Sequence, residues 1–489
     1  MMRALYSGVS GLKVHQTKMD VIGNNISNVN TVGFKSSNVT FADVLYQTSS
    51  NATGPNAETG RAGQNAMQIG LGAGVSSIMT TIETVGGSQR TDNPFDLMIE
   101  GDGFFVVNNG SGNYFTRAGS FTVDANGTLC NASGYAVMGW QVDPENPTQT
   151  VADTVSALQI MSPENQYSEP EATEAIHFAG NIDSADTSFD SETGKLTSFS
   201  FYDNLGRSYT ANLRLTQVED TDGTQIENQY VVSVVDVLDS NGDSILVTFD
   251  EDGEAVETGV NVSFGGVEFE IETDGKDYTV ASDDQLILTF DAATGKFKSI
   301  GSADDVDDDA EEGEFNSVDF VVSLDAVEEN PFAEAIDVDF SKLTMYAKSG
   351  STKIEPTKGN LEGLYTGRSA GTMKGVTVDS LGMIYGVYDN GTSKLLGQIV
   401  VATFANPSGL ESVGGSLFST TQNSGEFDGI GEAISASGGE FKTGVLEMSN
   451  VDLSTEFTNM ITTQRGFQAN SRIITTSDTL LEELINLKR

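Results

Sequence analysis

At the C-terminal end of the chain, residues 450 to 487 read NVDLSTEFTNMITTQRGFQANSRIITTSDTLLEELINL. Every seventh position of this stretch is apolar, and the row consists of Leu453, Met460, Phe467, Ile474 and Leu481. A companion row begins at Phe457 and ends at Ile485, with polar residues between them. An apolar stripe this narrow is typical of an α-helix that pairs with another helix. We therefore predict a C-terminal helix that packs along such a seam.

The N-terminal residues carry a matching pattern. Apolar residues at seven-residue spacing are Leu5, Leu12, Met19 and Ile26, and Ile22 and Val29 supply a second row. Gly8 and His15 stand where a strict coiled coil would place an aliphatic residue. Each helix alone could cover a globular core, but both stripes are narrow and strand-like sequence separates them. We predict that the two helices pair with each other and with helices of other copies.

Asparagines crowd the end of the N-terminal pattern, in NNISNVNTVGFKS at residues 24 to 36. They are Asn24, Asn25, Asn28 and Asn30. Asn side chains compete for backbone hydrogen bonds and mark caps and turns rather than helix interiors. We expect Asn28 and Asn30 to end the helix before residues 32 to 34 begin the next segment.

Between the two helices the sequence is typical of β structure. Short apolar runs such as FDLMIEGDGFFVV, QYVVSVVDVL and LLGQIVVATF are separated by turn dipeptides. Asn-Gly occurs at 126, 241 and 390, and Asp-Gly at 102, 222, 252 and 274, which are preferred hairpin turns. The expected fold is therefore mainly β with paired terminal α-helices, in several domains with β domains inserted between the helices.

Acidic residues are concentrated in one long segment in the middle of the chain. Residues 143 to 360 hold 48 of the 71 carboxylates but only 10 of the 25 Lys and Arg residues. We expect an acidic outer β domain, or two, at 143–361, in which the run DDVDDDAEEGE at 304–314 is a solvated loop. The other expected parts are terminal helices at 1–36 and 450–489, linkers at 37–75 and 441–449, and an inner β domain formed by 76–142 and 362–440.

Signals for chemistry are weak. The two histidines, His15 and His177, form no metal motif or catalytic triad, and GLGAGV at 70–75 fails the dinucleotide pattern. Cys130 is expected to be a small buried hydrophobe. Residues 239–250 resemble a calcium loop but have Ser244 in place of Gly and Asp250 in place of Glu, so a polar turn is favoured. We expect no enzyme activity, cofactor or metal.

The composition of the chain also argues against two classes of binding partner. A net charge of −46 opposes binding to nucleic acid or to anionic membrane surfaces. No apolar run is long enough to cross a membrane, and the first residues lack the apolar run of a secretory signal. We expect neither nucleic acid nor membrane insertion.

Three motifs together resemble the axial proteins of the bacterial flagellum. They are NNISNVNTVGFK after the first helix, FDLMIEGDGFFVV followed by YFTRAGSFTVDANG, and the C-terminal stretch quoted above. The resemblance covers about 1–142 and 362–489. Within this class, the large acidic insert and LLGQIVVATFANPSGL resemble the flagellar hook protein family rather than the distal rod proteins.

The resemblance implies a structural subunit that polymerises into a curved, flexible tube and acts as a universal joint between the motor and rod and the filament. The terminal helices would line the tube, and the asparagines would form hydrogen bonds between copies. Implied partners are other copies, a hook cap protein, the distal rod, the hook-filament junction proteins and the flagellar type III export apparatus. The implied location is extracellular, in the hook, after export without a cleavable signal peptide.

Two alternatives stay open at this point. A distal rod protein with an unusual insert would share both helices. A secreted adhesin, or a glycan-binding or carbohydrate-active protein, would house its site in the acidic insert, since β domains often present ligand grooves.

Overall fold

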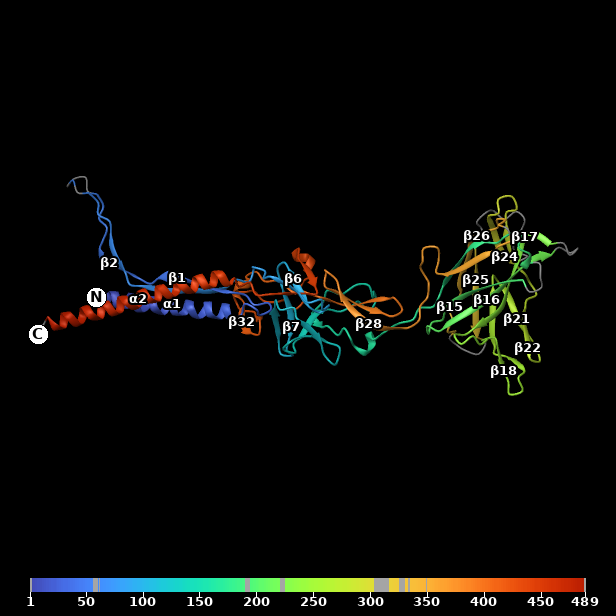
Figure 1. Ribbon diagram of the computed structural model, residues 1–489, viewed down its shortest axis with the longest axis horizontal. Coiled ribbons are helices and arrows are strands. Elements are labelled where there is room, and N and C mark those ends of the chain that lie inside the picture. The colour runs from blue at the N-terminus through green and yellow to red at the C-terminus, as the bar shows by residue number, and fades with distance from the viewer. Residues whose placement is uncertain are drawn as a thin grey trace. The chain divides into compact units, whose positions relative to one another are not determined.

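The computed structural model describes residues 2–55, 60, 62–189, 194–219, 225–302, 316–324, 330–332, 335–348 and 350–487. The chain is mainly β with one long helix at each end (Figure 1), which confirms the predicted fold class. It forms two compact units. The first contains Met1–Gln166, Met373–Val387 and Ser393–Arg489, and the second contains Tyr167–Thr372 and Tyr388–Thr392. The acidic run at 304–314 and the Asp-Gly turn at 222 lie outside the described residues.

The two helices are α1 (Met2–Ser27) and α2 (Leu453–Asn486). Asp452 caps α2, because its side chain accepts a hydrogen bond from the Ser454 N–H at 2.9 Å. The helices pack side by side and run antiparallel, since Gly8 lies against Ile474 and Asn25 bonds to Glu456. The predicted intrachain helix pair is therefore present.

A β arm replaces the linker that we expected at 37–75. It consists of β1 (Ser37–Asp43), β2 (Tyr46–Ser50), β3 (Met67–Gly70) and β4 (Ala73–Thr80), with β1 paired to β4 and β2 to β3. Composition concealed these strands, because Ser, Asn and Gly outnumber the alternating apolar residues such as Val39 and Phe41. The second expected linker, 441–449, was also wrong, since it holds strands that pair with the β domain.

The β domain of the first unit surrounds the Phe and Val residues of FDLMIEGDGFFVV, and Phe105 and Val107 are fully buried in its core. Its strands are β5 (Ser88–Arg90), β6 (Leu97–Glu100), β7 (Phe104–Asn108), β8 (Asn113–Thr116), β9 (Phe121–Val123), β10 (Leu129–Asn131), β11 (Ala136–Trp140), β12 (Ser156–Ala157), β28 (Gly371–Val378), β29 (Met383–Tyr388), β30 (Ser393–Ile399), β31 (Val401–Ala402), β32 (Glu411–Gly414), β33 (Leu417–Ser419), β34 (Glu440–Thr443) and β35 (Val445–Glu447).

The second unit has one hydrophobic core between a seven-stranded and a five-stranded sheet. Phe264 and Phe320 from the first sheet and Tyr230 and Leu288 from the second are buried in it. Its strands are β13 (Tyr167–Ser168), β14 (Ala175–Asn181), β15 (Lys195–Tyr202), β16 (Ser208–Glu219), β17 (Gln225–Leu238), β18 (Val247–Phe249), β19 (Ala255–Glu257), β20 (Val260–Phe264), β21 (Val267–Asp274), β22 (Asp277–Ala281), β23 (Leu286–Phe290), β24 (Phe297–Ser302), β25 (Ser317–Leu324), β26 (Ile336–Thr344) and β27 (Lys353–Lys358).

The boundaries of this acidic unit differ from the expected 143 and 361. Residues 143–166 belong to the first unit because β12 pairs with β11, and because Leu158 and Ile160 are fully buried in its core. Residues 362–372 belong to the second unit, where Arg368 bridges to Glu171. A drop in carboxylate density is thus a poor marker of where a core begins, because burial follows apolar residues rather than net charge.

A buried ion cluster ties the two ends of the chain to the β domain. The Glu447 carboxylate lies 2.7 Å from Lys35 Nζ and 3.8 Å from Arg117 Nη1, and all three side chains are at most 3% exposed. Lys35 also donates to the Thr84 carbonyl, and the Gly86 N–H donates to Glu447. Burial lowers the pKa of Lys35, and the Glu447 charge opposes that shift. We call Lys35, Arg117 and Glu447 the junction cluster.

Replacing Glu447 with Gln should destabilise the first unit by about 3–5 kcal/mol, because it leaves two buried cations without an anion. The free energy of unfolding in urea measures this. The matched control is Glu100→Gln, since Glu100 pairs with Lys442 at 2.6 Å and both side chains are about half exposed. That change should cost at most about 1 kcal/mol. Equal, small losses in both variants would show that the cluster is not a structural centre.

Candidate assembly interface on the terminal helices

Small and polar residues form the seam between α1 and α2. A Cβ added at Gly11 would lie 2.7 Å from the Asn470 amide, and one at Gly466 would lie 2.6 Å from the His15 ring. Gly8 is also close to α2, since a Cβ there would lie 3.1 Å from the Ile474 side chain. Thr463 and Ser477 of α2 are buried in the same seam. The glycines therefore allow the two backbones to approach closely, and little apolar surface is needed between them.

The predicted apolar rows contribute to this seam only in part. In α1, Ile22 is buried and the other row members, Leu5, Leu12, Met19, Ile26 and Val29, are half-buried. In α2, Met460, Ile474 and Leu481 are half-buried, whereas Leu453, Phe457 and Phe467 are exposed. A strict seven-residue row drifts by about 20° per heptad around a straight helix, so its members cannot all face one partner. For the same reason the row omitted Val14, which is 4% exposed.

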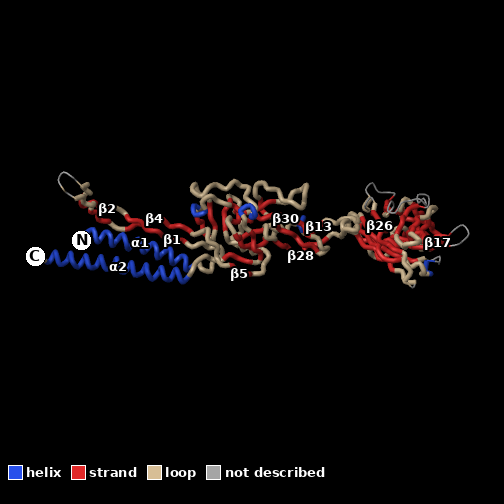
Figure 2. Tube along the Cα trace, turned by 90° about the horizontal axis from the view of Figure 1, so that it is seen from above, coloured by secondary structure: helices blue, strands red, loops and turns tan. Residues whose placement is uncertain are grey.

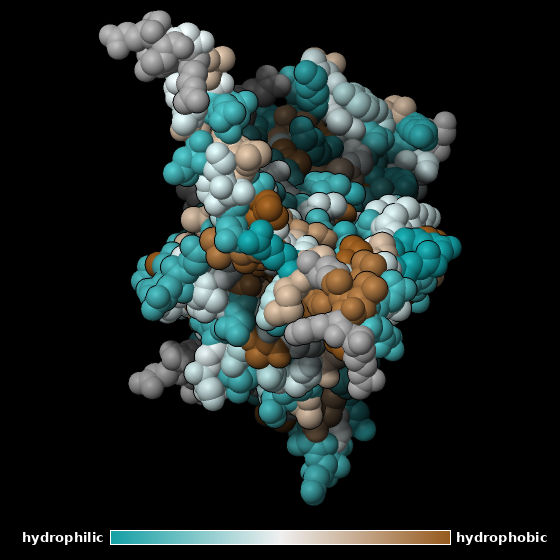
Figure 3. Space-filling model, turned by 90° about the vertical axis from the view of Figure 1, so that its left-hand side faces the viewer, coloured by the Kyte–Doolittle hydropathy of each residue, from teal (hydrophilic) through white to brown (hydrophobic). Residues whose placement is uncertain are grey.

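A large apolar face of the helices therefore has no cover within the chain. We call it the outer face of α2, and its members are 37–82% exposed: Leu453, Phe457, Ile461, Phe467, Ile473, Leu480, Leu484, Ile485 and Leu487. Met2, Tyr6 and Val9 of α1 are also exposed. Figure 3 looks onto the helix pair from the side where the two termini lie and shows hydrophobic residues at the surface there. Exposed large apolar side chains gathered on one element in this number indicate an interaction site.

The four asparagines have different surroundings. Asn25 is 1% exposed and is fully used within the chain: it accepts from Ser37 N–H at 3.0 Å and donates to the Ser37 carbonyl and to Glu456. The expectation that Asn25 bonds to other copies was therefore wrong. Its side-chain amide bonds to both the N–H and the carbonyl of Ser37 in β1, as the backbone of a neighbouring strand would. Asn28 donates to the Asn24 carbonyl at 2.9 Å, and α1 ends at Ser27.

Asn24 and Asn28 also line a cavity of about 720 Å³ between the end of α1 and the β domain of the same unit. Asn24 and Asn30 are exposed. The cavity is lined mainly by Ser, Thr, Asn and Gly, which is typical of a polar, hydrated surface rather than of a ligand pocket.

His15 is the one titratable group inside the helix seam among the described residues that shows a shifted pKa. Its ring packs against Gly466 of α2 and edge-on against Phe41 of β1, with centroids 5.8 Å apart. Its Nδ1 is buried and has no hydrogen-bond partner within the described part of the chain. Burial, and then the positive charge of Lys18, lower the pKa of His15 below 6.5.

Other candidate residues have structural surroundings. His177 Nδ1 lies 2.8 Å from the Gly359 carbonyl, and the half-buried Cys130 thiol donates to the Thr122 carbonyl. Asp239 accepts from the backbone N–H groups of Asn241 and Asp243, which caps a turn and lowers the pKa of Asp239. Within the described ranges, no three His, Cys, Asp or Glu side chains are grouped to hold a metal ion.

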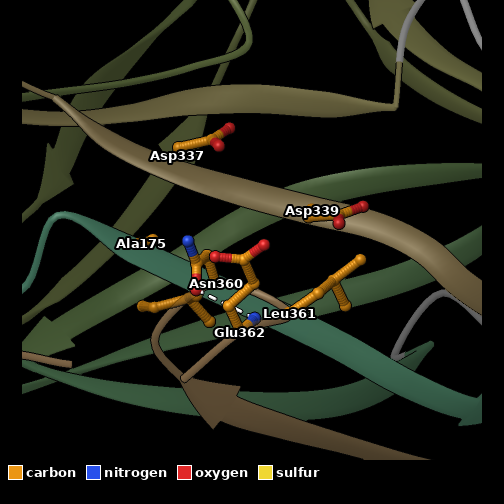
Figure 4. A pocket seen from close by; sticks show the side chains of 7 residues that line it. Ala175, Asp337, Asp339, Asn360, Leu361 and Glu362 are labelled. Atoms are coloured by element: carbon orange, nitrogen blue, oxygen red, sulfur yellow. Dashed lines mark hydrogen bonds between the residues drawn. The ribbon is translucent and has the colours of Figure 1, made fainter. Parts of the chain in front are cut away.

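A depression lies in the surface of the second unit (Figure 4). It has a volume of about 210 Å³ and is lined by Ala175, Ile176, Asp337, Asp339, Asn360, Leu361 and Glu362. Asn360 accepts from the Glu362 N–H, so this side chain holds its own turn. The depression is small, open and acidic, unlike the mostly apolar pockets that bind small molecules. Neither described helix is apolar over a length sufficient to cross a lipid bilayer.

The fold defines a class: β-rich, multidomain subunits with one long helix at each end of the chain. Known flagellar domains match along the chain. These are "Flagella basal body rod protein" at 5–35, "Flagellar hook protein FlgE/F/G D1 domain" at 98–169, "Flagellar basal body protein FlaE D2 domain" at 171–359 and "Flagellar basal body rod FlgEFG protein C-terminal" at 442–487.

Relatives that align over their whole length indicate which flagellar protein family the chain belongs to. The chain is 33% identical to flagellar hook protein FlgE of Treponema pallidum and 35% identical to that of Borreliella burgdorferi, each over the whole of both chains. It is 27% identical to flagellar basal-body rod protein FlgG of Bacillus subtilis, also over both whole chains. The chain therefore belongs to the flagellar hook protein family and is a structural subunit of the flagellar hook. The rod alternative has less support.

A solved structure, that of Helicobacter pylori flagellar hook protein FlgE2, aligns with 72% of this chain and 99% of that chain. The sequence identity is 14% and the TM-score is 0.32, so this likeness adds nothing to the argument.

Polymers of this chain should dissociate more readily as the pH falls from 6.5 toward 5. The seam favours the neutral ring of His15, so its stabilisation is complete above 6.5 and declines as the pH falls through the lowered pKa. The critical concentration for polymerisation, measured by sedimentation at pH 7.5 and 5.5, tests this. His15→Gln should remove most of the pH dependence in this window. An unchanged pH dependence in that variant would contradict the assignment.

Proposed function

We propose that copies of this chain polymerise into a curved, flexible tube whose inner wall consists of the terminal helices. The observation that supports this proposal is the outer face of α2, where nine apolar side chains are 37–82% exposed. Open-ended contacts between different surfaces of identical subunits produce helical filaments. Exposed apolar side chains on the terminal helices suit such contacts.

The predicted rows and asparagines take part in this assembly as follows. Leu453, Phe457 and Phe467 contact neighbouring copies, because they are exposed in the single chain. Asn24, Asn28 and Asn30 provide hydrogen bonds at the same contacts. The half-buried members of both rows, such as Met460 and Leu12, become fully buried only in the polymer.

Within the flagellum, the tube acts as a universal joint between the rod and the filament. Family membership supports an extracellular location after export through the flagellar type III apparatus, and end contacts with the distal rod, the hook-filament junction proteins and a hook cap protein. The role is mechanical rather than enzymatic. An adhesin or glycan-binding role is less favoured, since the depression lined by Asp337, Asp339 and Glu362 on the acidic unit is small, open and acidic.

The acidic second unit controls the shape of the tube rather than its formation. Its surface is dominated by carboxylates, so contacts between neighbouring copies are repulsive unless salt screens them, over roughly 10 Å at 0.1 M ionic strength. Many weak, salt-dependent contacts on an outer surface can bias curvature without holding the tube together.

Ile461→Asp and Phe457→Asp should abolish polymerisation of the purified chain. Each places a charge in a contact that excludes water, where an unpaired charge costs several kcal/mol. The matched control is Leu205→Asp, because Leu205 is 63% exposed on the second unit. Sedimentation and electron microscopy should show tubes for the wild type and the control and monomers for both helix variants. Tubes formed by the helix variants would place the assembly interface elsewhere.

Replacing residues 169–370 with a short Gly-Ser bridge should leave tube formation intact and reduce curvature. These limits keep β12, Leu158 and Ile160, which belong to the core of the first unit. A deletion that began near the expected boundary at residue 143 would remove them. Electron microscopy at two salt concentrations measures the curvature. If the shortened chain folds and forms no polymer, the second unit holds contacts that assembly requires.

A further inference from the structure

The far end of the β arm is exposed and apolar. Val44, Leu45, Tyr46, Met67 and Ile69 are 45–64% exposed, and every residue of β3 is exposed. These residues belong to the β2–β3 hairpin or to the turn before it, and Tyr46 pairs with Gly70 and Gln47 with Ile69. In Figure 1 this hairpin projects away from the helix pair. We call it the arm tip.

The root of the arm is fixed on α1. Val39 of β1 is 6% exposed, and Phe41 contacts both His15 and Lys18. Gly72 lies so close to Ser10 of α1 that no side chain fits there. Figure 2 shows β1 and β4 running beside α1. The arm tip is therefore held out from a packed base and is not a free tail.

Charge is depleted along the whole arm. Residues 37 to 80 contain three charged residues, Asp43, Glu58 and Arg61, whereas 20% of the whole chain is charged. The cores of protein interfaces are depleted of charge in this way. Exposed hairpin edges in soluble proteins are normally protected by Lys, other charges or Pro, and the described strands of the arm tip have none of these. The arm tip is thus built to be covered.

We propose that the arm tip of one copy docks on the outer face of α2 of a neighbouring copy. This inference rests on the proposed polymer. Both surfaces are exposed in the single chain and both are apolar. The strands β2 and β3 contain no charged residue, so they cover apolar helix side chains without burying a strand charge. Docking also explains why α2 carries large apolar residues on the side that α1 leaves open.

Covalent trapping tests the partner. In a Cys130→Ser background, one batch of chains carries Leu45→Cys, and two other batches carry Ile461→Cys or Leu480→Cys. The Leu45→Cys batch is mixed with each α2 batch, and the mixture is polymerised and then oxidised. At least one mixture should give a disulfide-linked heterodimer between Leu45→Cys chains and α2-variant chains. The same mixture oxidised without polymerisation should lack this heterodimer. Absence of both heterodimers from the oxidised polymer would overturn the proposal.

Side-chain removal separates this inference from the proposed function. The variant Leu45→Ser, Tyr46→Ser, Met67→Ser should raise the critical concentration for polymerisation by about tenfold or more, since it removes apolar contact area. The matched control is Leu196→Ser, Leu205→Ser, Phe249→Ser, which removes residues of similar exposure from the second unit. Both should unfold at the same urea concentration as the wild type. An unchanged critical concentration in the arm variant, while Ile461→Asp still prevents assembly, would refute arm docking and leave the polymer proposal standing.

Discussion

Each terminal helix covers only one face of the other, and the remaining features of this chain follow from that constraint. Gly8, Gly11 and Gly466 bring the backbones close together, so the seam is filled by small and polar side chains. Ile474 packs against Gly8 in this seam, whereas other large apolar residues of α2, such as Phe457 and Ile461, stay exposed. Covering such a side chain contributes about 1.5–3 kcal/mol, which the single chain does not gain. Under the proposed assembly, other copies supply this part of the stabilisation of the helices.

The junction cluster connects this incomplete helix pair to a complete β core. Lys35 follows α1, Glu447 precedes α2, and Arg117 belongs to the β domain. Moving any one of these three buried side chains away from the others would leave an unpaired charge in the interior, which is costly. The segments that follow α1 and precede α2 are therefore both fixed to the β domain at this cluster. A tube that bends while it transmits torque needs such a fixed connection between its wall and its outer parts.

Much of this organisation could be predicted from the sequence, because helices and strands each produce a regular spacing of apolar residues along the chain. The seven-residue rows located both helices, and the alternating runs identified the β domains. Partners that are distant in sequence carry no local signal. Lys35 and Glu447 are 412 positions apart, and Asn25 and Glu456 are 431 apart. The β arm was missed for a different reason, since its strands mix Ser, Thr and Gly with apolar residues such as Tyr46 and Ile69 that stay exposed, so no regular alternation of buried and exposed positions marks them.

Hydrogen exchange of α2 tests the central claim most directly, because it reports whether this helix is stabilised within one chain or only among several. Backbone amides of residues 453–486 should exchange rapidly in the unassembled chain and slowly in the polymer, while the β core, including Phe105 and Val107, stays protected in both. Equal, strong protection of α2 before and after assembly would show that the helix pair is complete within one chain, and would contradict this account.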